Sequence, residues 1–106
     1  MTTRGEDEGL LLVAIVQMAA EDNGAGQEYE DFVLARLTQH GGALERRTRT
    51  MDSGTEVHLI RFSSRAGYES FLADPDRVAR REQLGNAAPN TKVLEVRDVR
   101  DASASG

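Results

Sequence analysis

The chain has 106 residues and no cysteine, so it is expected to form one domain without disulfides, thiolate nucleophiles or cysteine-ligated metals. Its net charge of −5 provides no strong positive field, which argues against nucleic acid as a partner. The longest apolar run, residues 10–16, is too short to span a bilayer and follows an acidic segment, so we expect a cytoplasmic protein without a membrane partner.

Polar segments bracket the expected domain. Residues 1–8 and 101–106 lack apolar anchors and are predicted to be flexible tails, which leaves residues 9–100 for the folded domain. The domain begins with residues 9–18, a continuous apolar run rich in branched side chains. Such a run is typical of a central strand that is covered on both faces.

Residues 26–40 follow with apolar positions spaced three or four apart, which predicts a helix. Asp22 or Asn23 can cap the start of this helix through a side-chain oxygen. Gly41 is predicted to end it in the left-handed conformation that glycine adopts without strain.

Two strands joined by a tight turn are predicted next, at residues 43–51 and 55–62. The segment between them is interpreted as a three-residue loop with Gly54 in the left-handed conformation. This loop length places Glu45 opposite Arg61, and the opposite charges support the register. The remaining predicted pairs are Met51 with Thr55, Arg49 with Val57, Arg47 with Leu59, Leu44 with Phe62, Arg46 with Ile60, and Thr48 with His58.

A second helix and a fourth strand complete the domain. Ser63 or Ser64 can cap the helix, and Pro75 is predicted to interrupt it because proline cannot donate the helical hydrogen bond. Asp74 is then expected to cap the segment that restarts there. Residues 91–99 form the last strand, with Leu94 and Val96 predicted on one face and Glu95 and Arg97 on the other.

This β-α-β-β-α-β order predicts a ferredoxin-like α+β fold, a four-stranded antiparallel sheet with two helices on one face. The other face is predicted to mix charged and apolar side chains, so it needs a cover, and a second copy of the chain is the simplest one. The residues assigned to this face are Glu45, Arg47, Arg49, Val57, Leu59, Arg61, Val93, Glu95 and Arg97.

Three motifs connect this pattern with a known superfamily. They are QHGGALERR at residues 39–47, VHLIRFSSRAGYESFL at residues 57–72 and ADPDR at residues 73–77. With them, residues 10–99 resemble the dimeric α/β-barrel superfamily, and most of all its uncharacterised bacterial branch. The resemblance implies a homodimer with a pocket, either between the sheet and the helices or within the barrel, that could take a small-molecule ligand. It also implies relatives that include cofactor-independent monooxygenases, haem-degrading monooxygenases, isomerases and dehydratases. The chain has no tryptophan, so haem-based activities are not carried over and no cofactor is expected.

His58, in the third strand, is the best candidate for a general base because an ordinary histidine pKa lies near neutrality. The alternative is a partly buried histidine that is hydrogen-bonded to Thr48 across the hairpin. His40 is expected to stabilise the end of the first helix, and two histidines without spaced carboxylates make no metal motif.

Glu45, Arg47 and Arg61 form a second candidate cluster, which could bind an anionic ligand or be an ion-pair network at the dimer interface. Two functions follow from these residues. The first is a cofactor-independent enzyme of monooxygenase, isomerase or cyclase type that acts on a small cyclic or aromatic metabolite, with His58 in acid–base catalysis and Arg61 stabilising an anion. The second is a non-catalytic small-molecule-binding or scaffold dimer.

Overall fold

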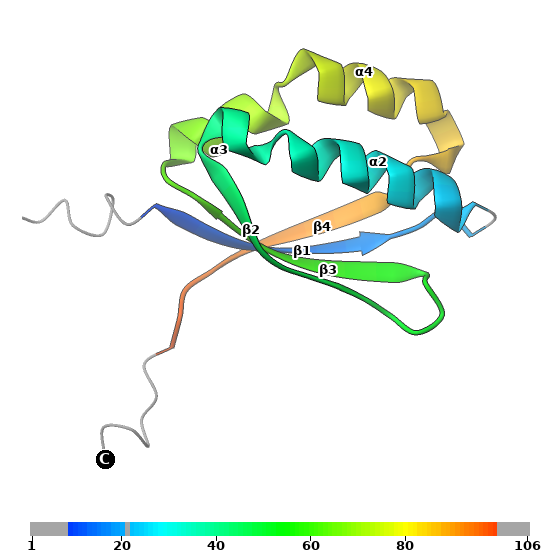
Figure 1. Ribbon diagram of the computed structural model, residues 1–106, viewed down its shortest axis with the longest axis horizontal. Coiled ribbons are helices and arrows are strands. Elements are labelled where there is room, and N and C mark those ends of the chain that lie inside the picture. Colours follow the sequence, from blue (N-terminus) through cyan, green and yellow to red (C-terminus); the bar gives the residue numbers. More distant parts are fainter. Residues whose placement is uncertain (1–8, 21, 100–106) are drawn as a thin grey trace, which may run out of the picture.

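The computed structural model describes residues 9–20 and 22–99, so the predicted tails at 1–8 and 101–106 lie outside the described residues. Four antiparallel strands form one sheet in the order β2-β3-β1-β4, and the helices cover one of its faces (Figure 1). This confirms the predicted ferredoxin-like α+β fold. The strands are β1 (Leu10–Gln17), β2 (Gly42–Arg49), β3 (Thr55–Phe62) and β4 (Asn90–Val96). The helices are α2 (Asn23–Ala35), α3 (Arg65–Leu72) and α4 (Pro75–Leu84), with short 3-10 helices η1 (Leu37–His40) and η2 (Gly85–Ala87).

Strand β1 lies inside the sheet, between β3 and β4, as its apolar sequence predicts. Its side chains alternate between the two faces, and those toward the helices, such as Leu12 and Val16, are buried in the core. Phe62 of β3 joins this core and packs against Phe71 of α3, with 5.5 Å between the ring centroids. In the described part of the chain, no helix is long and apolar enough to cross a membrane.

The predicted helix ends are confirmed with one difference. Asp22 caps α2 by accepting a hydrogen bond of 3.0 Å from the Ala25 amide. The helix therefore starts three residues earlier than predicted, at Asn23, and passes into η1 after Ala35. Gly41 ends η1 with a φ of 75°, the left-handed conformation that favours glycine.

The break before α4 is also confirmed. Asp74 accepts hydrogen bonds from the amides of Asp76 and Arg77, at 2.9 and 3.2 Å. The same carboxylate accepts hydrogen bonds from Arg36 Nε at 2.9 Å and His40 Nε2 at 2.7 Å. Asp74 therefore both starts α4 and ties that helix to the C-terminal end of α2, which holds α4 at a fixed place above the sheet.

The predicted hairpin register is wrong by one residue at the turn. Thr50 donates its amide to the Thr55 carbonyl at 2.9 Å, so the loop has four residues rather than three. Asp52 stabilises this wider turn by accepting hydrogen bonds from the Gly54 amide and the Thr50 hydroxyl. Ser53, not Gly54, has the positive φ of 65°.

A β-bulge between Leu44 and Arg46 shifts the pairing of β2 with β3 by one more residue. Between the turn and the bulge, side chains therefore lie on the opposite face from the predicted one. Arg47 and Arg49 point to the helix-covered face, whereas Glu45 stays on the open face and binds Arg61 at 2.7 Å. The observed pairs are Gly42 with Phe62, Ala43 with Arg61, Leu44 with Ile60, Arg46 with Leu59, Arg47 with His58, Thr48 with Val57 and Arg49 with Glu56.

Strand β4 is also reversed relative to the prediction. Val93 pairs with Ala14, whose side chain faces the helices, so Val93 faces them too. Glu95 lies on the same face and binds Arg65 of α3 at 2.9 Å, which leaves Leu94 on the open face.

These corrections change which residues lie on the open face of the sheet. Arg47, Arg49, Val93 and Glu95 leave it, and Leu94 and Val96 join it together with Arg46, Thr48 and Lys92. Val57 and Leu94 are 38% and 42% exposed on this face. We call it the open sheet face. Its apolar residues are Leu11, Val13, Ile15, Val57, Leu59, Leu94 and Val96.

Candidate functional site

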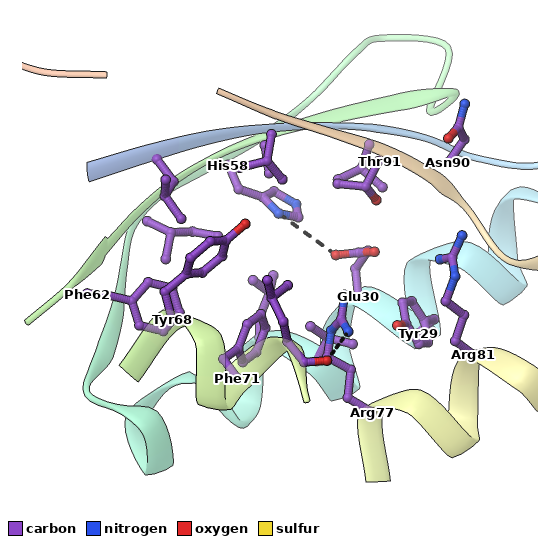
Figure 2. Close-up of a pocket in the computed structure, with 18 residues that line it drawn as sticks. Tyr29, Glu30, His58, Phe62, Tyr68, Phe71, Arg77, Arg81, Asn90 and Thr91 are labelled. Atoms are coloured by element: carbon purple, nitrogen blue, oxygen red, sulfur yellow. Dashed lines mark hydrogen bonds and ion pairs between the residues drawn. The ribbon is translucent and has the colours of Figure 1, made fainter. Parts of the chain in front are cut away.

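A cavity of about 270 Å³ lies between the helix-covered face of the sheet and the three α-helices (Figure 2). Most of its wall is apolar and comes from the core, including Ile60 and Phe62. The polar side chains that line it include Glu30 from α2, His58 from β3 and Arg77 from α4. An apolar cavity with a few converging polar groups is the usual form of a small-molecule site.

Glu56 holds His58 in place at the sheet. The two residues are neighbours on the same face of β3, and His58 Nε2 lies 2.7 Å from Glu56 Oε1. Arg47 Nε and Arg49 Nε each donate to the Glu56 carboxylate at 2.8 Å. Burial alone would raise the pKa of Glu56, but the hydrogen bonds from Arg47, His58 and Arg49 outweigh it and lower the pKa to about 2.

This arrangement fixes the tautomer of His58. Because Glu56 stays ionised, it accepts a hydrogen bond, so Nε2 of His58 carries the hydrogen and Nδ1 keeps its lone pair. Burial lowers the pKa of His58 and outweighs the opposing effect of its hydrogen bond to Glu56. The imidazole is therefore neutral at physiological pH, with a basic nitrogen on the cavity side.

Glu30 lies opposite that nitrogen. Its Oε1 atom is 3.9 Å from His58 Nδ1, which is longer than a hydrogen bond (Figure 2). The side chain is 5% exposed, and burial followed by the charge of Glu56 raises its pKa to about 7. Near neutral pH, Glu30 is thus present both as an acid and as a carboxylate.

Glu30 and Glu56 are two carboxyl groups whose environments push their pKa values far apart, a pattern that marks acid and base roles in enzyme sites. The neutral His58 lies between them. Figure 2 also shows the hydroxyl of Tyr68 pointing into the cavity on the His58 side. This wall can accept a proton at His58 and donate one from Glu30.

The sequence matches no protein-family model and no curated protein. Its structure, however, is similar to several solved structures. PA3566 from Pseudomonas aeruginosa superimposes with a TM-score of 0.70 at 17% identity, over 90% of this chain and 98% of that one. A single-residue variant of SnoaB, a cofactor-independent oxygenase from Streptomyces nogalater, gives 0.66 at 13% identity, over 89% and 96%.

A third similar structure is the ActVA-Orf6 monooxygenase from Streptomyces coelicolor in complex with nanaomycin D. Its TM-score is 0.57 at 15% identity, over 89% of this chain and 92% of that one. The chain has the same fold as these three proteins. The match covers nearly the full length of each, so it confirms the fold that the resemblance to the α/β-barrel superfamily implies.

Within this fold, the sequence-predicted residues lie in two places. His58 is on the cavity wall, but its partner is Glu56, so the predicted hydrogen bond to Thr48 is wrong; the Thr48 hydroxyl donates to the Val57 carbonyl instead. Arg47 lies behind Glu56 and also binds Asp31 of α2 at 2.8 Å. It positions the Glu56 carboxylate and does not line the cavity.

Glu45 and Arg61 bind each other on the open sheet face, across the sheet from His58, so the predicted cluster with Arg47 is divided between two faces. His40 lies outside the cavity and bridges Ser70 and Asp74, with hydrogen bonds of 2.7 Å to each. Within residues 9–20 and 22–99, no group of three or more histidine, aspartate or glutamate side chains could hold a metal ion.

Sequence reasoning missed Glu56 and Glu30. Glu56 alternates with His58, Ile60 and Phe62 along β3, so the period of a strand already places it on the apolar face. Glu30 lies next to Tyr29 but off the predicted apolar stripe of α2. Its burial depends on α4 and the sheet closing over it, which no local pattern encodes.

Proposed function

We propose that this protein is a cofactor-independent enzyme that removes a proton from a small cyclic or aromatic metabolite. The observation that carries the proposal is the Glu56–His58 pair, which presents a neutral, oriented imidazole nitrogen to an apolar cavity. A buried carboxylate that fixes the tautomer of a histidine is the usual support of a histidine general base. Glu30 supplies a second proton-transfer group 3.9 Å away.

In the proposed reaction, His58 Nδ1 accepts a proton from an acidic C–H or O–H of the substrate and becomes imidazolium, which the charge of Glu56 stabilises. The electron pair stays on the substrate as an enolate or phenolate. Protonation of that anion at another atom, by Glu30, gives an isomerase. Attack of the anion on an electrophile in the same molecule gives a cyclase. Reaction of the anion with dioxygen, which is the oxidant, forms a C–O bond and, after protonation, a hydroperoxide; loss of water from the hydroperoxide leaves one oxygen atom on the substrate as a carbonyl, which is the outcome of a monooxygenase.

The similar structures support a chemistry of this kind without a cofactor. SnoaB is described as a cofactor-independent oxygenase, and ActVA-Orf6 is a monooxygenase that holds nanaomycin D. The cavity of this protein has a volume of about 270 Å³, which suits a compound of one or two rings. His58 and Glu30 are the residues that we propose for catalysis.

The proposed enzyme is a cytoplasmic homodimer in which two open sheet faces pack against each other. A single sheet layer with an exposed apolar face is more stable when that face is covered. Glu45 and Arg61 would then lie at the interface. Their charges would favour association of the two subunits, and Arg61 could also contact an anionic ligand there.

The test is exchange of carbon-bound hydrogen for deuterium in heavy water. β-Tetralone, a bicyclic ketone with acidic C–H groups, is incubated with the protein and followed by proton NMR. We expect the protein to accelerate exchange, and His58→Gln to reduce the catalysed rate by about 100-fold or more. His40→Gln is the matched control because His40 lies outside the cavity.

Exchange at equal rates in wild type and His58→Gln would contradict the proposal. Binding of β-tetralone without accelerated exchange would favour the second function, a non-catalytic binding dimer. Dioxygen consumption in the same samples distinguishes oxygenation from simple proton transfer.

A further inference from the structure

Two hydrogen-bond donors are buried at the cavity without a partner in the protein. Among the described residues, the buried side-chain polar atoms that lack a hydrogen-bond partner are Tyr29 Oη and Arg77 Nε. Both residues line the cavity, and Tyr29 is only 3% exposed. Buried donors are nearly always satisfied in folded proteins, so two exceptions at one cavity require an explanation. An acceptor on a bound ligand provides one.

The same end of the cavity carries excess positive charge. Arg77 and Arg81 lie one helical turn apart on α4 and both line the cavity, and Figure 2 shows them reaching from α4 toward the sheet. Each donates one hydrogen bond to a backbone carbonyl, Arg77 to that of Leu72 at 3.1 Å and Arg81 to that of Pro89 at 2.9 Å. These bonds fix the guanidinium groups without neutralising them.

Neither arginine has a carboxylate in contact within the described part of the chain. The positive charges of both arginines act on Glu30 through space and oppose the rise of its pKa, but Glu30 forms an ion pair with neither. Its own burial also keeps Glu30 partly protonated near neutral pH. The side of the cavity next to α4 therefore carries two fixed positive charges, those of Arg77 and Arg81, and hydrogen-bond donors that have no acceptor in the protein. We call this side the cationic wall.

We infer that this wall is an anion subsite, and that the substrate of the proposed enzyme is a small ring compound bearing a carboxylate. Guanidinium groups bind carboxylates through short, charge-assisted hydrogen bonds, and Tyr29 Oη can add a third donor. A carboxylate held at α4 leaves the ring against the apolar wall formed by Phe71 and Ile60. The opposite edge of the ring then faces His58 and Glu30. The inference rests on the proposed function for its substrate, but the subsite can be tested alone.

The experiment is isothermal titration of the full-length protein with β-naphthoate and with its neutral isostere β-naphthamide. We expect naphthoate to bind more tightly by about tenfold or more, since charge-assisted hydrogen bonds replace neutral ones. Arg77→Gln and Arg81→Gln should each weaken naphthoate binding by about tenfold while leaving naphthamide binding unchanged.

Two further variants make the test specific. Arg80→Gln is the matched control, because Arg80 lies on the same helix but stacks on Phe32 at 4.3 Å and does not line the cavity. Tyr29→Phe removes only a hydroxyl that has no protein partner, so it should fold normally and still weaken naphthoate binding.

Equal affinity for the two probes, no binding of naphthoate at millimolar concentration, or an equal loss in Arg80→Gln and Arg81→Gln would overturn the subsite. The subsite and the proposed function are tested independently. If naphthoate selectivity holds but β-tetralone exchange does not depend on His58, the subsite stands and the proposed chemistry fails; the reverse outcome leaves the chemistry and removes the subsite.

Discussion

Glu30 Oε1 on α2 and His58 Nδ1 on β3 lie 3.9 Å apart, and the two side chains are 5% and 1% exposed. The fold buries a carboxyl group and an imidazole face to face without a hydrogen bond between them. Such a pair is unfavourable for stability alone, since each group loses hydration and gains little from the other. This pair therefore gives the protein a pH dependence that can be measured without knowing the substrate.

Glu30 should make the protein less stable as the pH rises. Burial and the charge of Glu56 raise its pKa from 4.5 to about 7, so the native state keeps a proton that the unfolded state releases. Stability is therefore lost between pH 4.5 and about 7, and Glu30→Gln should recover on the order of 3 kcal/mol above that range.

Urea unfolding of wild type and Glu30→Gln across this pH range checks the prediction. Burial lowers the pKa of His58, which changes stability in the opposite direction, but this contribution is present in both proteins. The difference between the two curves thus isolates Glu30. Parallel curves would show that Glu30 has an ordinary pKa.

Glu56→Gln should be among the most destabilising conservative changes in the chain. The carboxylate is 0% exposed and binds Arg47, Arg49 and His58. A glutamine there keeps one acceptor oxygen, loses the negative charge and turns an NH2 donor toward groups that are themselves donors. We expect a loss of about 3–5 kcal/mol in the free energy of unfolding, measured by urea titration at neutral pH. Glu45→Gln is the control, because its pair with Arg61 is partly exposed and should contribute at most about 1 kcal/mol. Equal losses in the two variants would contradict this ranking.

Charge on the open sheet face should prevent dimer formation. Val57→Asp and Leu94→Asp each place a carboxylate within the exposed apolar surface that we propose to be the interface. Light scattering at micromolar concentration should show a dimer for wild type and a monomer for both variants. Val78→Asp, at a valine of equal exposure on α4, should remain dimeric. A monomeric wild type would refute the proposed assembly.

Gly67→Ala should destabilise the junction of α3 with η1. A Cβ atom on Gly67 would collide with the carbonyl oxygen of His40, which is backbone and cannot rotate away. We expect a loss of about 1–3 kcal/mol, measured as a lower midpoint of urea unfolding. Gly24→Ala in α2 is the control, since its Cβ would meet nothing closer than 3.9 Å, and it should be neutral or stabilising.

Local signals in the sequence predict much of this fold correctly. Asp22, Gly41, Ser64 and Asp74 act as the caps that their residue types predict, because a cap depends only on hydrogen bonds within a few residues. The apolar run that becomes β1 is recognisable for the same reason. The histidine at the cavity, His58, could be named from its strand alone.

Tertiary structure alone decided which faces the charged strands present and which groups meet at the site. The four-residue turn carries Arg47 and Arg49 to the helix-covered face, since a one-residue shift reverses a strand, and the bulge between Leu44 and Arg46 reverses the alternation again, so that Leu44 keeps its predicted face. Glu30 approaches His58 because α2 packs across the sheet, a contact between residues far apart in the chain. The sequence by itself therefore determined the elements, their order and their caps. Packing between the elements set their register, and with it the pairing of Glu30 with His58 and the cationic wall on α4.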